Sequence, residues 1–141
     1  MTQEDKELLL KDLCARLPYG VKAYIKNWSK LDRKYYEGVY TVESIDPSLN
    51  NIFADSERSS VEVIVGYDNY EIKPYLFPFS SMTEEQKEEY CSLQQKVIYN
   101  NKGLVNSDVM EYVNWCYKNH IDINNLIPMG LAIDATGLNI Y

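Results

Sequence analysis

Hydrophobic residues recur at helical spacing at the start of the chain, alternate with polar residues through the middle, and return to helical spacing afterwards. A first helix is therefore expected over residues 2–17, and Pro18 ends it. Two more helices are expected over residues 84–100 and 107–120. The alternating pattern, typical of strands with one buried face, occurs in residues 21–28, 37–45, 61–65 and 70–76.

These segments predict one α+β domain over residues 1–141, because a chain of this length forms a single domain by default. An N-terminal helix (1–17) is expected to precede a four-stranded antiparallel meander or small SH3-like barrel (21–76). Two helices and a packed C-terminal tail (83–141) are expected to follow. The third and fourth strands are expected to form a hairpin through a tight turn at residues 66–69.

Local signals define the connections between these elements. Residues 49–60 are predominantly polar and are expected to form a loop, and residues 100–103 are expected to link the last two helices. Pro74 cannot donate a ladder hydrogen bond, so its strand is expected to lie at a sheet edge there or to have ended. Thr83 and Gln86 fit the capping box of a helix that begins after Thr83.

The composition limits the classes of protein to which the chain belongs. Its net charge of −7 argues against nucleic-acid binding in general and duplex DNA in particular, because such binding neutralises phosphates with Lys and Arg. No apolar run approaches the ~18 residues of a membrane-spanning helix, and the acidic N-terminus lacks the pattern of a secretory signal. Cys14, Cys91 and Cys116 are far apart, so we expect reduced core thiols and a cytoplasmic location.

Residue patterns that indicate catalysis are scarce. His120 is the single histidine, and Asp122 lies two residues further on. A hydrolase built on this pair would need a nucleophile brought near by the fold. The simpler interpretation places His120 in the last turn of its helix, where it suits the negative end of the dipole. No P-loop, dinucleotide-binding glycine motif or zinc-ligand spacing occurs. The chain is therefore not expected to be an enzyme, and no cofactor or metal is expected.

Tyrosine is unusually frequent, with 13 residues, and the tyrosines of the β region are interleaved with Lys and Arg. Rings beside cations could stack on bases or bind a nucleotide. They could equally form a protein-binding face, because tyrosine is enriched in interface cores, or the solvated face of an ordinary sheet. The candidate binding residues are Tyr24, Lys26, Arg33, Tyr36, Tyr40, Lys73 and Tyr75.

Three blocks of sequence resemble a known family. They are LLLKDLCARLPYGV (residues 8–21), IKPYLFPFSSMT (residues 72–83) and a C-terminal pattern WxxxxHxDxxxLIxxGLA that begins at Trp115. Together they look like a family of small uncharacterised proteins from gut anaerobes and their prophages and other mobile elements. Relatives tend to carry arginine where this chain has Phe77. The resemblance implies no activity and no catalytic residues, only an accessory role in the cytoplasm.

The favoured interpretation is a non-enzymatic protein-binding module, acting as a prophage or mobile-element accessory protein in contact with a host or phage protein. The alternative is a binder of a nucleotide or oligonucleotide that scavenges a signal. A second alternative is a hydrolase that uses His120. A protein partner is therefore expected first and a nucleotide second, and no membrane partner is expected.

Overall fold

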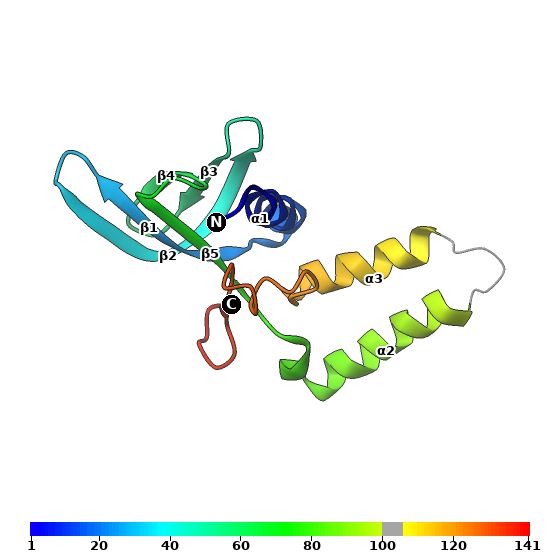
Figure 1. The fold of residues 1–141 in the computed structure, drawn as a ribbon. Helices are drawn as coiled ribbons and strands as arrows, with labels where there is room; N and C mark the ends of the chain where they lie inside the picture. Colours follow the sequence, from blue (N-terminus) through cyan, green and yellow to red (C-terminus); the bar gives the residue numbers. More distant parts are fainter. Residues whose placement is uncertain (100–105) are drawn as a thin grey trace.

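The computed structural model describes residues 1–99 and 106–141, and Figure 1 shows how its elements are arranged. The α+β class is confirmed. The helices are α1 (Gln3–Arg16), α2 (Glu84–Tyr99) and α3 (Asn106–Lys118). The strands are β1 (Lys22–Ser29), β2 (Lys34–Asp46), β3 (Asn51–Asp55), β4 (Ser60–Ile64), β5 (Tyr70–Leu76) and β6 (Ile133–Asp134). The link predicted at residues 100–103 lies outside the described residues.

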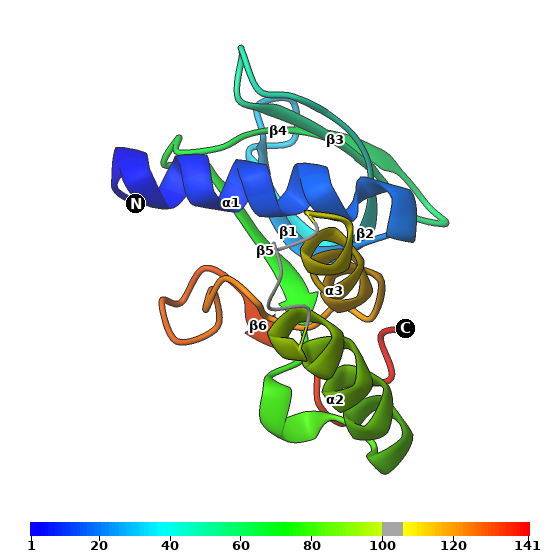
Figure 2. The same ribbon diagram turned by 90° about the vertical axis from the view of Figure 1, so that its right-hand side faces the viewer.

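Helix α1 begins where the sequence indicates. The Asp5 N–H donates to the Thr2 hydroxyl oxygen at 3.1 Å, and the Thr2 N–H donates to the Asp5 carboxylate at 2.9 Å. This reciprocal pair satisfies two backbone donors that a helix start otherwise leaves without partners. The helix lies across the sheet (Figure 2). It contributes the buried side chains of Leu9, Leu10 and Leu13 to the core.

The strands form one six-stranded open sheet in the order β4-β3-β2-β1-β5-β6, so the prediction of a four-stranded meander or closed barrel was wrong. Strand β3 lies inside the segment predicted to be a polar loop. Its Ile52 and Ala54 point into the core, while Asn51, Phe53 and Asp55 face away. A strand with only two inward apolar side chains carries a weak alternating signal, and for that reason the segment resembles a loop.

The predicted hairpin of the third and fourth strands is also absent from the described sheet. Strand β4 pairs with β3, whereas β5 crosses over and pairs antiparallel with β1. The turn between them includes Gly66, whose φ of 90° is the left-handed conformation that glycine adopts most easily. A turn signal between two strands shows that the chain reverses, but it does not show which strand becomes the neighbour.

Pro74 occupies a sheet edge, as its missing N–H requires. The Trp28 N–H donates to the Asn69 carbonyl at 3.2 Å, so Asn69 directs its backbone groups toward β1. Because this direction alternates along a strand, Lys73 in β5 also directs its backbone groups toward β1. Pro74 is the next residue, and its nitrogen therefore points to the opposite side, where β6 pairs only with Tyr75 and Leu76. The edge prediction is confirmed, and the proline blocks hydrogen bonding at this position.

Helices α2 and α3 form a hairpin that projects away from the sheet (Figure 1). The capping box that starts α2 is confirmed, because Thr83 and Gln86 exchange hydrogen bonds of 3.0 and 3.1 Å. Aromatic side chains hold the two helices together: the Tyr90 ring lies 5.5 Å from that of Tyr112 and 6.0 Å from that of Trp115. No helix in the described ranges is long and apolar enough to cross a membrane.

The C-terminal tail is packed, as predicted, and the structure shows that it lies along β5. The Phe77 N–H donates to the His120 carbonyl at 2.9 Å, and the Asp122 N–H donates to the Phe77 carbonyl at 2.8 Å. Further along, the Ala135 N–H donates to the Leu76 carbonyl at 2.8 Å. These bonds extend the sheet beyond β5 and bring the end of the chain back to β1.

Candidate functional site

Cross-strand pairing gathers one set of side chains on the surface of the sheet opposite α1. In β1 and β2 the facing pairs include Tyr24 with Val39, Lys26 with Glu37, and Trp28 with Tyr35. Residues directly opposite each other lie on the same face of an antiparallel pair. The intervening residues of β1, such as Ile25, point into the core. We call the resulting surface the outer face; it consists of Tyr24, Lys26, Trp28, Tyr35, Glu37, Val39 and Lys73.

The aromatic residues of the outer face are in direct contact. The rings of Trp28 and Tyr35 pack edge to face with centroids 4.8 Å apart. The Lys26 amine lies 4.7 Å from the centroid of the Tyr35 ring, within the range of a cation–π interaction. Tyr35 is nevertheless 48% exposed and Val39 41% exposed. The outer face is therefore an ordered aromatic surface that remains accessible.

Charges on the outer face are locally paired. The Tyr24 hydroxyl donates to the Glu37 carboxylate at 2.5 Å, and this bond raises the pKa of Tyr24 to about 12. Lys73 forms an ion pair of 2.9 Å with Glu71 on the same strand. Because each cation lies beside a carboxylate or a ring, the surface has no concentrated positive field.

The structure brings together Tyr24, Lys26 and Lys73 of the predicted binding residues, all on the outer face. The other four lie elsewhere. Tyr36 and Tyr40 point to the opposite side of β2, where Tyr40 is buried in the core. Arg33 lies in the β1–β2 turn in a left-handed conformation with a φ of 51°. Tyr75 is buried, and its carbonyl accepts a hydrogen bond from the Tyr141 hydroxyl at 2.8 Å.

Trp28, Tyr35, Glu37 and Val39 belong to the same surface, although sequence reasoning did not select them. These four residues can be identified from the register of β1 with β2. Residues 30–33 form a turn, so counting outward from it pairs Trp28 with Tyr35 and Lys26 with Glu37. Residue type alone cannot separate the two faces of β2, because tyrosines occur on both.

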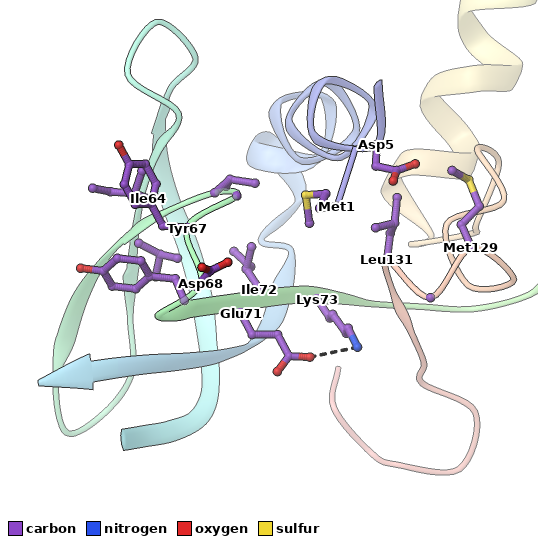
Figure 3. A pocket seen from close by; sticks show the side chains of 15 residues that line it. Met1, Asp5, Ile64, Tyr67, Asp68, Glu71, Ile72, Lys73, Met129 and Leu131 are labelled. Atoms are coloured by element: carbon purple, nitrogen blue, oxygen red, sulfur yellow. Dashed lines mark ion pairs between the residues drawn. The ribbon is translucent and has the colours of Figure 1, made fainter. Parts of the chain in front are cut away.

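A hollow of about 420 Å³ opens between the start of α1, the β4–β5 connection and the tail (Figure 3). Met1, Met129 and Leu131 contribute apolar walls. The Asp5 carboxylate already caps α1, and Glu71 already pairs with Lys73, as the dashed line in Figure 3 marks. Asp5, Glu71 and Lys73 are therefore engaged in contacts within the fold.

A second, larger hollow of about 790 Å³ runs beside β2, and we call it the β2 groove. One wall is β2 itself, and the other is the turn between β3 and β4. The Tyr40 hydroxyl and the Ser59 hydroxyl approach to 3.5 Å across it. The groove is lined by Lys22, residues 36–41 and residues 55–59.

A buried ion pair connects α1 to the C-terminal tail. The Arg16 guanidinium donates to the Asp12 carboxylate at 2.7 and 3.0 Å and to the Ile121 carbonyl at 2.8 Å. The Asn124 amide donates to the same carboxylate at 2.8 Å. Asp12 and Arg16 are both fully buried. Asp12 and Arg16 are four residues apart on a helix, which is also the spacing of exposed ion pairs. The sequence therefore does not show that this pair is buried.

His120 does not lie in the last turn of α3, so that prediction was wrong. It follows the helix in a left-handed conformation with a φ of 55°. The backbone N–H of His120 donates to the Tyr117 carbonyl at 3.1 Å, and the backbone N–H of Ile121 donates to the Cys116 carbonyl at 2.9 Å. This is the Schellman arrangement that commonly ends a helix at glycine. Burial, with a smaller effect of the nearby Arg16 charge, lowers the pKa of His120 to about 4, so the ring is neutral at pH 7.

The carboxylate of Asp122 is engaged by the backbone. Its two oxygens accept hydrogen bonds from the Leu126 N–H at 2.7 Å and the Ile127 N–H at 2.9 Å. Asp122 therefore organises the turn of the tail. The Nδ1 atom of His120 is buried and has no hydrogen-bond partner within the described part of the chain.

The thiols differ in exposure. Cys116 is buried, and burial raises the pKa of its thiol to about 11. Cys14 is half-buried, and burial also raises its pKa. Cys91 is exposed on α2, so the prediction that all three thiols are core residues was wrong. Across residues 1–99 and 106–141, no group of three His, Cys, Asp or Glu side chains is placed to hold a metal ion.

No protein-family model, curated protein or solved structure matches this chain.

Proposed function

We propose that this chain is a non-enzymatic protein-binding module and that the outer face is its contact surface. The observation that carries the proposal is the packed pair of Trp28 and Tyr35 with the Lys26 amine over the Tyr35 ring. The hairpin of β1 and β2 that bears these residues extends away from the three helices (Figure 1). An accessible aromatic surface of this kind suits a protein partner.

The energetics of interfaces support this choice. Tryptophan and tyrosine bury a large area while losing little side-chain entropy, and they are over-represented among the residues that dominate binding energy. On the outer face the contacts between rings already hold Trp28 and Tyr35 in place. Less conformational freedom is then lost on binding, which favours affinity.

A nucleotide or oligonucleotide is the weaker candidate. Binding phosphates requires cations that are not already neutralised, and affinity then falls steeply with salt. Here Lys73 is paired with Glu71, and Glu37 lies directly opposite Lys26. The locally balanced charge therefore favours a protein surface over a phosphate backbone.

Hydrolysis at His120 is supported less than binding. A general base needs a nucleophile within hydrogen-bond reach and a partner that orients the ring. The Asp122 carboxylate is engaged by backbone amides, and the nearby Cys116 thiol has a pKa raised to about 11 instead of lowered.

The resemblance to proteins of prophages and mobile elements adds the proposal that the partner is a host or phage protein.

The test compares substitutions on and off the outer face. Immobilised wild-type chain is used to capture and identify a partner, whose affinity is then measured by calorimetry against Trp28→Ala and Tyr35→Ala. Each substitution is expected to cost ~2 kcal/mol if the residue is an interface hot spot. Tyr67→Ala is the control, because Tyr67 is exposed but lies in the β4–β5 connection.

Two results would contradict the proposal. One is a partner whose affinity is unaffected by both outer-face substitutions. The other is a nucleotide that raises the melting temperature of the chain and binds with a steep salt dependence, which would favour the nucleotide alternative.

A further inference from the structure

The first half of β2 has a free hydrogen-bonding edge. Strand β2 extends over Lys34–Asp46, but its pairing with β3 begins only at Thr41. Residues 34–40 are therefore paired on one side, with β1, and no described strand lies on their other side. A strand edge of this kind can accept a further strand.

The register identifies which backbone groups face that edge. The Val42 N–H donates to the Val21 carbonyl at 2.9 Å, so Val42 directs its backbone groups toward β1. Because successive residues of a strand alternate in this respect, the N–H and C=O groups of Tyr36, Gly38 and Tyr40 also face β1. The N–H and C=O groups of the residues between them point to the free edge; these residues are Tyr35, Glu37 and Val39.

This edge lacks the features that commonly protect an exposed strand. On β5, Pro74 removes the donor that would face outward at its position. Residues 35–39 contain no proline, and the carboxylate of Glu37 is held by the Tyr24 hydroxyl at 2.5 Å. The register of β2 with β1 is also unbroken over these residues. The edge therefore presents a regular extended backbone.

The β2 groove provides room for side chains of an added strand. Gly38 lies between Tyr36 and Tyr40 on the groove side of β2. A Cβ atom at Gly38 would lie 3.5 Å from the Tyr40 ring, an ordinary van der Waals distance, so the glycine is not required to relieve a clash. Its lack of a side chain leaves a slot beside Tyr40, and glycine in a strand often marks the close approach of a ligand.

We propose that this edge binds an extended peptide segment of a partner protein by strand addition, with basic and apolar residues in alternation. The residue opposite Glu37 would be basic, and the residues on either side of it would place apolar side chains over Gly38 in the β2 groove. The basic residue would lie on the outer face, opposite the Glu37 carboxylate. Among the residues that line the groove, Asp55 and Glu57 balance the cations Lys22 and Arg58, so the groove has no excess of positive charge that would repel a basic peptide. The inference rests on the proposed protein-binding function and names the form of the partner.

A second copy of the chain is a poorer occupant. Antiparallel pairing of two edges about a two-fold axis at Glu37 places two carboxylates directly opposite each other, and like charges in that position destabilise a sheet. The net charge of −7 adds repulsion between copies. A basic peptide would place a positive charge opposite Glu37, and it would be attracted to the negatively charged chain instead of repelled by it.

The test uses a synthetic hexapeptide of alternating lysine and valine, blocked at both ends, and measures amide hydrogen exchange by NMR. Peptide is expected to slow exchange at Tyr35, Glu37 and Val39, whose N–H groups face the edge. The amides of Gly38 and Tyr40 already bond to β1 and should change little. A peptide N-methylated at its lysine amides should lose binding, because those amides would face β2. The same peptide N-methylated at its valine amides should retain it.

A pair of variants supplies the second measurement. Val39→Pro removes one N–H from the edge without breaking a bond to β1, and it should weaken binding of the lysine–valine peptide by about tenfold or more. Val39→Thr keeps the N–H and the branched side chain and should bind the lysine–valine peptide about tenfold or more tightly than Val39→Pro does. If Val39→Pro unfolds, the two N-methylated peptides still decide the question with wild-type protein.

Three outcomes would overturn the inference. They are unchanged exchange at the three edge amides in excess peptide, equal binding of both N-methylated peptides, and concentration-dependent dimerisation that protects the same amides without peptide. The proposed function is judged separately. A partner lost with Trp28→Ala but kept with Val39→Pro would contradict only strand addition, whereas a partner kept in both would contradict the outer face as well.

Discussion

The imidazole ring of His120 stacks on the phenol ring of Tyr141, with centroids 3.8 Å apart and planes inclined by 12°. The Tyr141 hydroxyl donates to the Tyr75 carbonyl at 2.8 Å and accepts a hydrogen bond from the Lys22 N–H at 3.1 Å. The last residue of the chain thus joins the end of α3 to strands β1 and β5. These contacts predict that Tyr141 contributes to the stability of the whole fold.

Substitution of Tyr141 separates its two interactions. Tyr141→Phe keeps the stacked ring and loses both hydrogen bonds of the hydroxyl, so it should cost ~1–3 kcal/mol of unfolding free energy, at about 0.5–1.5 kcal/mol for each bond. Tyr141→Ala removes the ring and the hydroxyl and should cost more. Urea unfolding measures both values. Equal midpoints for the wild type and Tyr141→Ala would mean that the C-terminal contact does not stabilise the fold.

Stability should fall as the pH is lowered through the range set by His120. The pKa of His120 is lowered in the folded state from 6.5 to about 4, because burial disfavours the charged ring. Between these values the unfolded chain binds a proton that the folded chain does not, so protonation favours unfolding. The contribution of His120 is complete above pH 6.5 and is lost on the way to about pH 4, on the order of 3 kcal/mol.

His120→Asn provides the comparison for that pH dependence, because asparagine tolerates the left-handed conformation at this position and does not titrate. The free energy of unfolding is measured for both proteins at pH 7 and near pH 4. The wild type should lose more stability than the variant over this interval. Carboxylates titrate in both proteins and cancel in the difference, so parallel pH curves would contradict the assignment.

The buried pair of Asp12 and Arg16 should respond differently to single and double substitution. Asp12→Ala leaves the Arg16 guanidinium buried without its counter-ion and should cost ~3–5 kcal/mol. Replacing both residues with apolar ones of similar size, Asp12→Leu with Arg16→Met, should cost much less, because no charge is then desolvated. Guanidinium unfolding of the three proteins measures the difference. A double variant as unstable as Asp12→Ala would show that the pair itself stabilises the fold.

Local patterns predicted the three described helices and four of the six described strands, but not β3 or β6. The capping box at Thr83 is a short-range arrangement, and it is formed as the sequence indicates. Pro74 lies at a sheet edge because its covalent structure permits little else. Features decided by a few neighbouring residues can be read from those residues alone.

Long-range pairing could not be predicted in the same way. The sequence between β4 and β5 reverses the chain, yet the partner of β5 is β1, because register and packing decide which edges meet. The same limit applies to the candidate site. Tyr24 and Lys73 were selected by residue type, whereas Trp28 joins them only through its pairing with Tyr35. The buried pair of Asp12 and Arg16 has the spacing of a surface pair, and only the tail that covers it makes it different.

The Thr83 cap gives a direct measure of how much the start of α2 contributes. The Thr83 hydroxyl oxygen accepts a hydrogen bond from the Gln86 N–H at 3.1 Å. Thr83→Ala should therefore cost ~0.5–2 kcal/mol, and Thr83→Ser, which keeps the acceptor, should be nearly neutral. Urea unfolding of both variants tests this. Equal losses in the two variants would attribute the effect to the side-chain methyl group and not to the cap.

Thiol labelling should distinguish the three cysteines by their surroundings. Cys91 is exposed on α2 and should react first with a maleimide at pH 7. Cys116 is buried and its pKa is raised to about 11, so little of the reactive thiolate is present and access is blocked. Mass spectrometry over time should therefore show one fast modification, and all three thiols should react in denaturant. Cys91→Ser is the control, because it should remove the fast phase alone. Rapid labelling of Cys116 in the folded protein would mean that the C-terminal end of α3 opens readily. The stack of His120 on Tyr141 would then be a transient contact.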